Sequence, residues 1–374
     1  MSKPFFQKVT HKFFVLFNFL IAVFFLAGAN ARYFNPGTWW FIGFLTLSLP
    51  YLLVLLIIFI IYWIIVRSPW VMLPVIVILF ALKGIQNIIP FNFPSEFKMH
   101  KDTGTIRIMT WNVEQFEILQ HKEHPELKQE MLDLINHYQP DIMCFQEMVA
   151  GAEKKAINNI PDFKTKLKFI NYYYSFDERL DFDANHHFGI MIFSKKRIIN
   201  NETIFHPPHD YNTTFQYVDV IANADTIRVY NLHLQSLKFS KANRQYLDRP
   251  AANTDTTINE YKNIFSKIKS GFIKRGVQAD YIREELIKSP YPVIVCGDFN
   301  DVPDSYAYET IGDGLQNAFV KKGSGLGRTF SGISPTLRID NIFVDQQFKI
   351  QQFTRIKQRL SDHFPLITDV YLKH

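Results

Sequence analysis

The chain has 374 residues, with 41 lysine and arginine side chains against 35 aspartate and glutamate side chains, and a formal net charge of +6. Residues 1–90 contain six basic residues and no acidic residue, so residues 91–374 are formally neutral. The composition therefore excludes the interpretation that the whole chain is a basic nucleic-acid-binding protein.

Three apolar stretches lie at the start of the chain. Residues 13–29, 40–66 and 68–89 consist mainly of Leu, Ile, Phe and Val, and the first two carry no charge. An apolar run of 18 or more residues is long enough to cross a bilayer core of about 30 Å as a helix. We therefore predict about three transmembrane helices in a membrane anchor of residues 1–90. The third stretch contains Lys83 and Gly84, and the alternative is that it lies at the membrane interface.

Basic residues flank the first two stretches unequally. Three lysines precede the first stretch and Arg67 follows the second, whereas Arg32 is the one basic residue between them. Because basic loops favour the cytoplasmic side, we predict a cytoplasmic N-terminus. Three spans then place the rest of the chain outside the cytoplasm, whereas two spans would place it in the cytoplasm. The first stretch also resembles a signal peptide, but cleavage near residues 27–31 would leave the side of the domain unchanged.

Residues 91–104 are polar and contain Pro94 and Gly104, so they are predicted to form a linker. Residues 105–374 have the length of one large two-layer catalytic domain. Every candidate catalytic residue lies beyond the linker. We therefore expect residues 100–374 to form a soluble and active unit without the membrane helices.

Apolar patterns in the domain predict strands early and late in the chain. Alternating or continuous apolar runs typical of strands cover residues 105–111, 141–146, 188–194, 293–296, 338–344 and 366–371. A hairpin over 215–234 is predicted to turn at residues 223–225. Helical spacing predicts helices within residues 125–138 and 258–289. Cys144 and Cys296 lie within two apolar runs and are predicted to be buried thiols rather than a disulfide.

Polar motifs follow or end several of these strands. In chain order they are Trp111-Asn112, Gln146-Glu147, Asn231-Leu232-His233, Gly297-Asp298-Phe299-Asn300, Arg338-Ile339-Asp340 and Ser361-Asp362-His363. Their order and chemistry resemble the endonuclease/exonuclease/phosphatase superfamily over roughly residues 104–373. The resemblance implies an α/β domain, a four-layer sandwich of two packed mixed β-sheets flanked by helices. Its active site would lie where strand ends and loops converge.

The resemblance implies that Asn112, Glu147 and Asp362 hold a metal ion. Amide and carboxylate oxygens are hard ligands of the kind that Mg²⁺ prefers, and Mn²⁺ is a possible substitute. Cleavage of a phosphate ester requires neutralisation of the charge on the phosphate oxygens, which such an ion provides.

Five further residues match catalytic positions of the superfamily. The resemblance implies that Asp298 orients or deprotonates the attacking water, and that Asn300 donates a hydrogen bond to a phosphoryl oxygen. His233 would contact the phosphate. Asp340 and His363 would form a carboxylate–imidazole pair in which the aspartate orients the ring and supports its protonated form.

We therefore predict a membrane-anchored hydrolase that cleaves phosphate mono- or diesters by water attack. Its partners would be a phosphate-ester substrate and the lipid bilayer, and the sequence indicates no protein partner. A nuclease is one alternative, although the neutral domain argues against tight, non-specific duplex binding. A lipid or headgroup phosphatase, or a sphingomyelinase-like phosphodiesterase, is favoured by proximity to the membrane alone. A catalytically silent binding protein is a third alternative, and the intact residue set argues against it.

Overall fold

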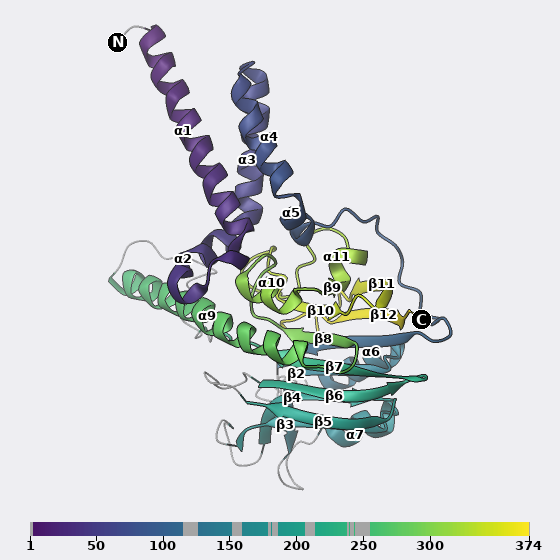
Figure 1. Cartoon of the computed structure of the whole chain (residues 1–374). Helices are drawn as coiled ribbons and strands as arrows, with labels where there is room; N and C mark the ends of the chain where they lie inside the picture. The colour runs from purple at the N-terminus through teal and green to yellow at the C-terminus, as the bar shows by residue number, and fades with distance from the viewer. Residues whose placement is uncertain are drawn as a thin grey trace.

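The protein consists of a stalk of apolar helices that rises from one end of a sandwich of strands and helices (Figure 1). The N-terminus lies at the far end of the stalk, and the C-terminus lies on the sandwich. The computed structural model describes residues 3–114, 126–151, 159–178, 181, 186–205, 214–237, 239, 243 and 255–373.

Two six-stranded mixed sheets form the centre of the sandwich. The first has the order β11-β12-β1-β2-β4-β3. Its strands are β1 (Ile106–Asn112), β2 (Ile142–Gly151), β3 (Asn171–Phe176), β4 (His186–Ser194), β11 (Phe348–Arg355) and β12 (Leu366–Leu372). The second has the order β5-β6-β7-β8-β10-β9. Its strands are β5 (Ile198–Ile204), β6 (Thr214–Ala222), β7 (Asp225–His233), β8 (Val293–Asp298), β9 (Gln316–Asn317) and β10 (Asp340–Val344). The pairs β1–β2 and β7–β8 are parallel, and the other pairs are antiparallel.

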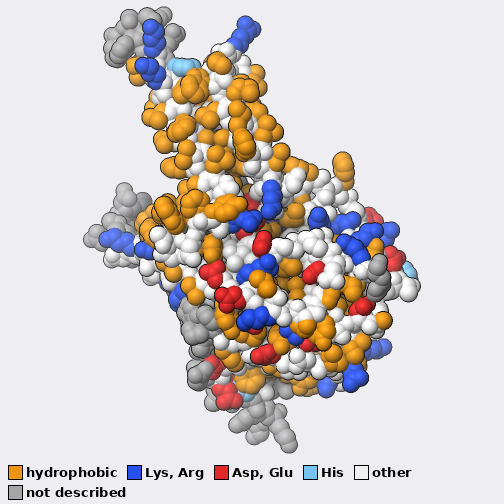
Figure 2. Space-filling view, in the orientation of Figure 1, with side chains coloured by type: hydrophobic (Ala, Val, Ile, Leu, Met, Phe, Trp, Pro, Cys, Tyr) orange, Lys and Arg blue, Asp and Glu red, His pale blue; other side chains and the backbone are white. Residues whose placement is uncertain are grey.

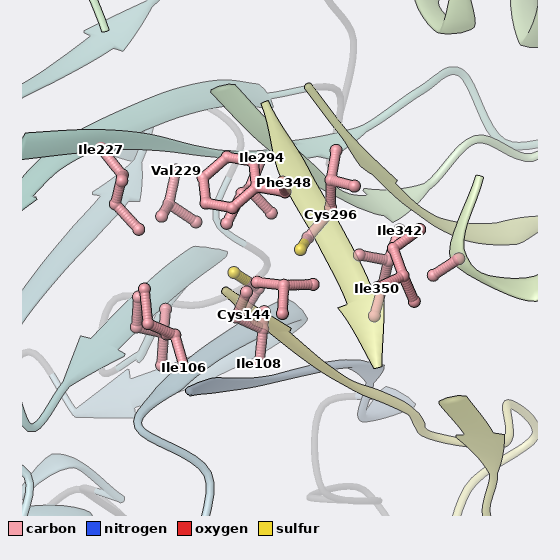
Figure 3. Close-up of a cluster of buried hydrophobic side chains, with 14 of the residues drawn as sticks. Ile106, Ile108, Cys144, Ile227, Val229, Ile294, Cys296, Ile342, Phe348 and Ile350 are labelled. Carbon is pink, nitrogen blue, oxygen red and sulfur yellow. The ribbon is translucent and has the colours of Figure 1, made fainter. Parts of the chain in front are cut away.

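The two sheets pack face to face through an apolar layer. Alternate side chains of the strands point into this layer, as the period of two along a strand requires. Cys144 of β2 and Cys296 of β8 approach each other across the layer from opposite sheets (Figure 3). Both are buried free thiols.

Helices cover the outer face of each sheet. Helices α6 (Leu127–Tyr138) and α7 (Ile160–Lys166) pack on the first sheet, and α9 (Asp255–Ile287) and α10 (Tyr306–Gly312) pack on the second. The short helix α11 (Ala318–Lys322) packs against β10 and β11. The arrangement is helix, sheet, sheet, helix, so the predicted four-layer α/β sandwich is confirmed.

The stalk contains the apolar stretches found in the sequence. Its helices are α1 (Lys3–Ala29), α2 (Pro36–Leu47), α3 (Leu49–Ile65), α4 (Met72–Phe80) and α5 (Leu82–Ile88). Within the described part of the chain, Lys8–Ala29 is the one helix that is by itself long and apolar enough to cross a membrane. The number rises to as many as three if each of two bent helix pairs counts as one span.

The second and third predicted spans are not straight helices. The stretch at 40–66 bends by 56° between α2 and α3, where Pro50 occupies the first turn of α3. Proline has no N–H group to continue the hydrogen-bond ladder of α2, so a new helix begins there. The stretch at 68–89 bends by 66° between α4 and α5. The predicted number of about three spans therefore stays a prediction, which requires each bent pair to act as one span.

Helix α5 is bound to the sandwich by a buried polar cluster. Arg338, two residues before Asp340, donates hydrogen bonds to the backbone carbonyls of Asn87 and Ile88. The side chain of Asn87 donates to carboxylate oxygens of Asp304 at 2.7 Å and Glu309 at 2.9 Å. The carbonyls at the end of α5 thus obtain the partners that a helix terminus lacks within itself.

Helix α2 packs on α9 through aromatic side chains. The ring of Phe44 stacks on Phe265 with a centroid distance of 5.0 Å and meets Phe272 edge-on at 5.3 Å. Gly43 lies so close to Phe272 that a Cβ atom would come within 2.6 Å of its ring. Removal of residues 1–99 would uncover this apolar surface and the partners of Arg338. This packing argues against the expectation that residues 100–374 are soluble without the stalk.

We expect Arg338→Met to destabilise the full-length protein by about 3 kcal/mol or more, because it leaves two buried carbonyls and nearby carboxylates without their cation. The melting temperature in detergent should fall clearly. Arg359→Met, at an exposed position, is the matched control and should melt like the wild type. Equal melting temperatures for the two variants would show that the cluster does not hold the stalk to the sandwich.

Candidate active site

Strand ends from both sheets meet at one place on the sandwich. Asn112 ends β1 and pairs in register with Gln146 of β2, directly before Glu147. In the other sheet, Asp298 ends β8 and pairs with His233 of β7. Strand β10 runs antiparallel to β8, so its first residue, Asp340, pairs with Asp298. The sequence therefore brings these residues together through strand register.

Asp298 lies at the centre of this group, with 1% of its surface exposed. Its carboxylate accepts hydrogen bonds from the backbone N–H of Asn300 at 2.8 Å and from the side chain of Asn112 at 3.1 Å. Burial, together with the nearby charge of Asp340, raises the pKa of Asp298 to about 7. A carboxyl group with this pKa exchanges its proton near neutral pH.

His363 and Asp340 form the predicted pair. The Nδ1 atom of His363 lies 2.8 Å from a carboxylate oxygen of Asp340, and its Nε2 atom lies 3.8 Å from Asp298. Burial favours the neutral ring, but the charges of Asp340 and Asp298 outweigh it and hold the pKa of His363 well above its usual range. The ring is also flanked by Phe330 at a centroid distance of 5.1 Å. The imidazole is thus fixed in orientation and favoured in its protonated form.

His233 and Asn300 border Asp298. The Nε2 atom of His233 lies 3.6 Å from Asp298 and 3.9 Å from Glu147. The Nδ2 group of Asn300 donates to the carbonyl of Leu234 at 3.0 Å, which engages one of its two N–H bonds and leaves the other for a further acceptor.

Two of the three predicted metal ligands, Glu147 and Asp362, lie on the more open side of the site, and the third, Asn112, is buried beside them. The side chains of Glu147 and Asp362 are 21% and 22% exposed, whereas that of Asp298 is almost fully buried. Glu147 sits at an irregularity of β2 with a φ of 53°, which turns it out of the strand. Asn112 donates through Nδ2 to Glu147 at 3.3 Å. The amide N–H₂ group of Asn112 also donates to Asp298, so its oxygen would turn toward Glu147 only if a cation lay between them.

Glu114 belongs to this site and was not identified from the sequence. Its carboxylate accepts the backbone N–H of Asp362 at 3.2 Å, and its own N–H donates to the side-chain oxygen of Asn112 at 3.1 Å. It therefore adds a carboxylate beside two of the predicted metal ligands. Its position two residues after Asn112, in the run Trp-Asn-Val-Glu, was the signal available.

Other motif residues hold the catalytic loops in place. The indole N–H of Trp111 donates to the carbonyl of His363 at 3.0 Å, and the hydroxyl of Ser361 donates to the carbonyl of Asn112 at 2.8 Å. The hydroxyl oxygen of Thr329 accepts the backbone N–H groups of Ile339 and Asp340. The contacts of Trp111 and Ser361 join the loop that carries His363 to β1. The contacts of Thr329 join the start of β10 to the loop before that strand.

A second group of side chains also has a geometry that suits a metal ion. Ligand atoms of Asp298, Asp340 and His363 all lie within 4.8 Å of one another. In this group, however, the Nδ1 atom of His363 is already engaged by Asp340. The site thus contains an open set of oxygen ligands and a buried carboxylate–imidazole set side by side.

A family model described as the endonuclease/exonuclease/phosphatase family matches residues 109–363, which is more than half of the chain. The chain belongs to this family. The predicted superfamily membership is therefore confirmed. Members of the endonuclease/exonuclease/phosphatase family are phosphoesterases and nucleases, which supports a hydrolase of phosphate esters. A second model, described as a domain of unknown function, matches residues 11–88.

Solved structures of the endonuclease/exonuclease/phosphatase fold resemble the sandwich. TDP2 from D. rerio, solved with a single-strand DNA product, has a TM-score of 0.50 at 15% identity, over 72% of this chain and 99% of that one. A mannosyl-6-phosphatase from Bacteroides thetaiotaomicron also has a TM-score of 0.50 at 15% identity, over 71% of this chain and all of that one (100%). At this identity the likeness concerns the fold alone. No curated protein sequence matches the chain.

We expect Asp340→Asn to lower the pKa of both His363 and Asp298 in the metal-free protein. The charge of Asp340 stabilises the imidazolium of His363 and opposes ionisation of Asp298, and asparagine removes that charge while keeping an acceptor oxygen. NMR titration of protein with isotope-labelled histidine and aspartate would measure both groups. Asp345→Asn, just beyond the other end of β10, is the control. An unchanged pKa for His363 in Asp340→Asn would contradict the assigned pairing.

Proposed function

We propose that this protein is a membrane-anchored, divalent-metal-dependent phosphoesterase in which Asp298 positions and deprotonates the attacking water. The observation that carries the proposal is the setting of Asp298: it is buried, has a pKa of about 7, and lies within 4 Å of two histidines. A base whose pKa is near the working pH combines the required ionised state with a useful driving force for proton transfer.

The remaining catalytic residues stabilise the phosphate in this proposal. His363, kept protonated by Asp340, donates through Nε2 to a phosphoryl oxygen, and the free N–H of Asn300 donates to the same group. His233 lies between Asp298 and Glu147, where it contacts the phosphate from the opposite wall. Fixed donors in a buried site stabilise charge that grows in the transition state without any reorganisation of water.

The oxygen donors around the open side of the site fit a divalent cation. Asn112, Glu147 and Asp362, with Glu114 beside them, offer hard oxygen donors, and the partial exposure of Glu147 and Asp362 leaves room for water ligands. We assign Mg²⁺ to this set, with Mn²⁺ as a substitute. The cation would neutralise phosphate charge and lower the pKa of a bound water. Asp298, Asp340 and His363 are assigned to proton transfer and phosphate binding, because the Asp340–His363 hydrogen bond occupies that pair.

The membrane attachment bears on the class of substrate. Apolar side chains cover the stalk, whereas charged side chains of both signs are dispersed over the sandwich (Figure 2). The sandwich has no net positive charge, which disfavours the tight, non-specific binding of a nucleic-acid duplex. A lipid or headgroup phosphate is therefore favoured over a nucleic acid, and the complete constellation argues against a silent binding protein.

The proposed domain organisation is a membrane anchor at 1–90, a linker at 91–104 and a catalytic domain at 105–374, with the catalytic domain outside the cytoplasm. Three crossings, by α1 and by each of the two bent helix pairs taken as one span, agree with a stalk whose N-terminal end lies opposite the sandwich. Lys and Arg side chains gather at that far end (Figure 2), as expected for the cytoplasmic side.

We expect hydrolysis of phosphate esters to require Mg²⁺ or Mn²⁺ and to be abolished by EDTA. Asp298→Asn and His363→Ala should each lower kcat by at least about 100-fold, because each removes a proton-transfer or charge-stabilising group. The assay uses the full-length protein with a chromogenic phosphodiester and monoester. Asp345→Asn is the control for folding and expression. Full activity of a folded Asp298→Asn variant in EDTA would exclude this mechanism.

We expect a reporter that is active only outside the cytoplasm to be active when fused after residue 374 in a bacterial host. The same reporter fused after Arg67, at the far end of the stalk, should be inactive. The opposite pattern would place the catalytic domain in the cytoplasm. That outcome would also make a cytoplasmic nucleic acid a stronger candidate substrate.

A further inference from the structure

A cavity of about 340 Å³ lies between the stalk and the sandwich, which we call the junction groove. Its lining combines residues of the α2–α3 junction, such as Leu47 and Tyr51, with Ile268 and Phe272 of α9 and Leu337 of the loop before β10. Most of this lining is apolar. A cavity of this size, with apolar walls and a few polar groups, is typical of a site for a small organic molecule.

The junction groove borders the candidate active site at Asn300. Asn300 lines the groove, and its backbone N–H donates to Asp298 at 2.8 Å. Ile339, which directly precedes Asp340, also lines it. A molecule in the groove would therefore have one end beside the group that we assign to water activation.

The junction groove also borders the bend of the apolar helices. Ser48 lines the groove at the point where α2 and α3 diverge by 56°. Tyr51, on the first turns of α3, forms a hydrogen bond of 3.0 Å with Ser334 of the sandwich, so the groove is bounded by both parts of the protein. The groove thus extends from the apolar helices to Asn300 of the candidate site.

The surroundings of α2 have the character of a membrane–water interface. The ammonium group of Lys269 lies 4.4 Å from the ring centre of Trp40, and Phe265 of α9 is exposed beside it. Aromatic and basic side chains together favour the headgroup region of a bilayer. These side chains lie close to the groove residues Ile268 and Phe272 of α9, which favours a position of the junction groove near such an interface.

The basic side chain in the groove is neutralised within the protein. Arg275 donates to a carboxylate oxygen of Asp301 at 3.0 Å and to the carbonyl of Gln235 at 3.0 Å. Both bonds hold the guanidinium inside the wall, and the carboxylate of Asp301 offsets its charge. The groove is thus suited to a hydrocarbon chain, whereas a nucleic-acid backbone would need free cations.

We propose that the junction groove binds a hydrocarbon chain of an amphiphilic phosphate ester that enters from the bilayer, with its phosphate at Asp298 and Asn300. The proposal rests on the proposed phosphoesterase function and specifies its substrate class as a membrane lipid with an esterified phosphate. Burial of each methylene in an apolar site favours binding, so chain length should control the specificity of the enzyme.

The first test measures hydrolysis by the full-length protein of substrates with a short or a long alkyl chain. The diester pair is p-nitrophenyl butyl phosphate and p-nitrophenyl dodecyl phosphate, and the monoester pair is butyl phosphate and dodecyl phosphate. All are used below their critical micelle concentrations. In whichever pair the enzyme cleaves, diester or monoester, we expect kcat/KM to be at least about tenfold higher for the dodecyl ester than for the butyl ester. Ile268→Trp, which fills the groove, should lower this ratio. Val277→Trp, at an exposed position of the same helix outside the groove, should leave the ratio unchanged. Equal rates for both chain lengths would overturn the groove proposal and leave the phosphoesterase function standing.

The second test does not depend on activity. The full-length protein in nanodiscs is irradiated with phosphatidylglycerol that carries a diazirine at the end of one acyl chain, and crosslinked peptides are identified by mass spectrometry. Crosslinks to residues 268–272 or 333–339 that disappear in Ile268→Trp are expected. Crosslinks confined to α1, α3 and α4 would overturn the proposal. If no phosphate ester is cleaved, the proposed function fails, and the crosslinks alone decide whether the groove binds a lipid chain.

Discussion

The active site depends on placing two carboxylates opposite each other in a buried strand pair. The register of β8 and β10 sets Asp298 against Asp340, and like charges opposite each other in a sheet repel. Negative charge in so buried a place needs a nearby cation, and His363 supplies it. The raised pKa of His363 and the raised pKa of Asp298 are therefore two results of one arrangement. The hydrogen bonds of Trp111 and Thr329 matter because they keep this cation in position.

Sequence reasoning recovered the centre of the fold and the site better than their edges. Strands β1, β2 and β8 are buried on both faces, so their apolar runs were distinct, and the polar residues after them marked the site. Edge strand β5 carries the polar run Asn200-Asn201-Glu202, which hides its alternation, and it was not predicted. Glu114 was missed because a lone carboxylate after a strand has no pattern of its own, and its contact with Asp362 appears only in three dimensions. The superfamily and its sandwich were predicted from motif order, which propensities alone would not have given.

The boundary between the predicted membrane anchor and the catalytic domain was predicted from the polar composition of residues 91–104. Composition does not reveal which segments contact each other in the folded protein. The linker is polar, yet the helices before it return to the sandwich. Arg338 illustrates the reason: in the sequence it is one basic residue near Asp340, and in the structure it caps a helix 250 residues earlier in the chain. Because Arg338 and Asp340 are close neighbours, the segment that orients His363 is also the segment that fixes the stalk. The position of the active site relative to the apolar helices is therefore built into the fold.

The two cysteines have a consequence for the compartment in which the domain is proposed to lie. Burial, with the neighbouring thiol of Cys296, raises the pKa of Cys144 well above its usual value, so almost no thiolate is present at neutral pH. Disulfide chemistry begins from the thiolate and requires access, and the folded core provides neither. An oxidising environment would therefore leave this pair reduced once the two sheets have closed over it. The chain is exposed to oxidation only before folding, when its two cysteines could be linked to each other or to another molecule.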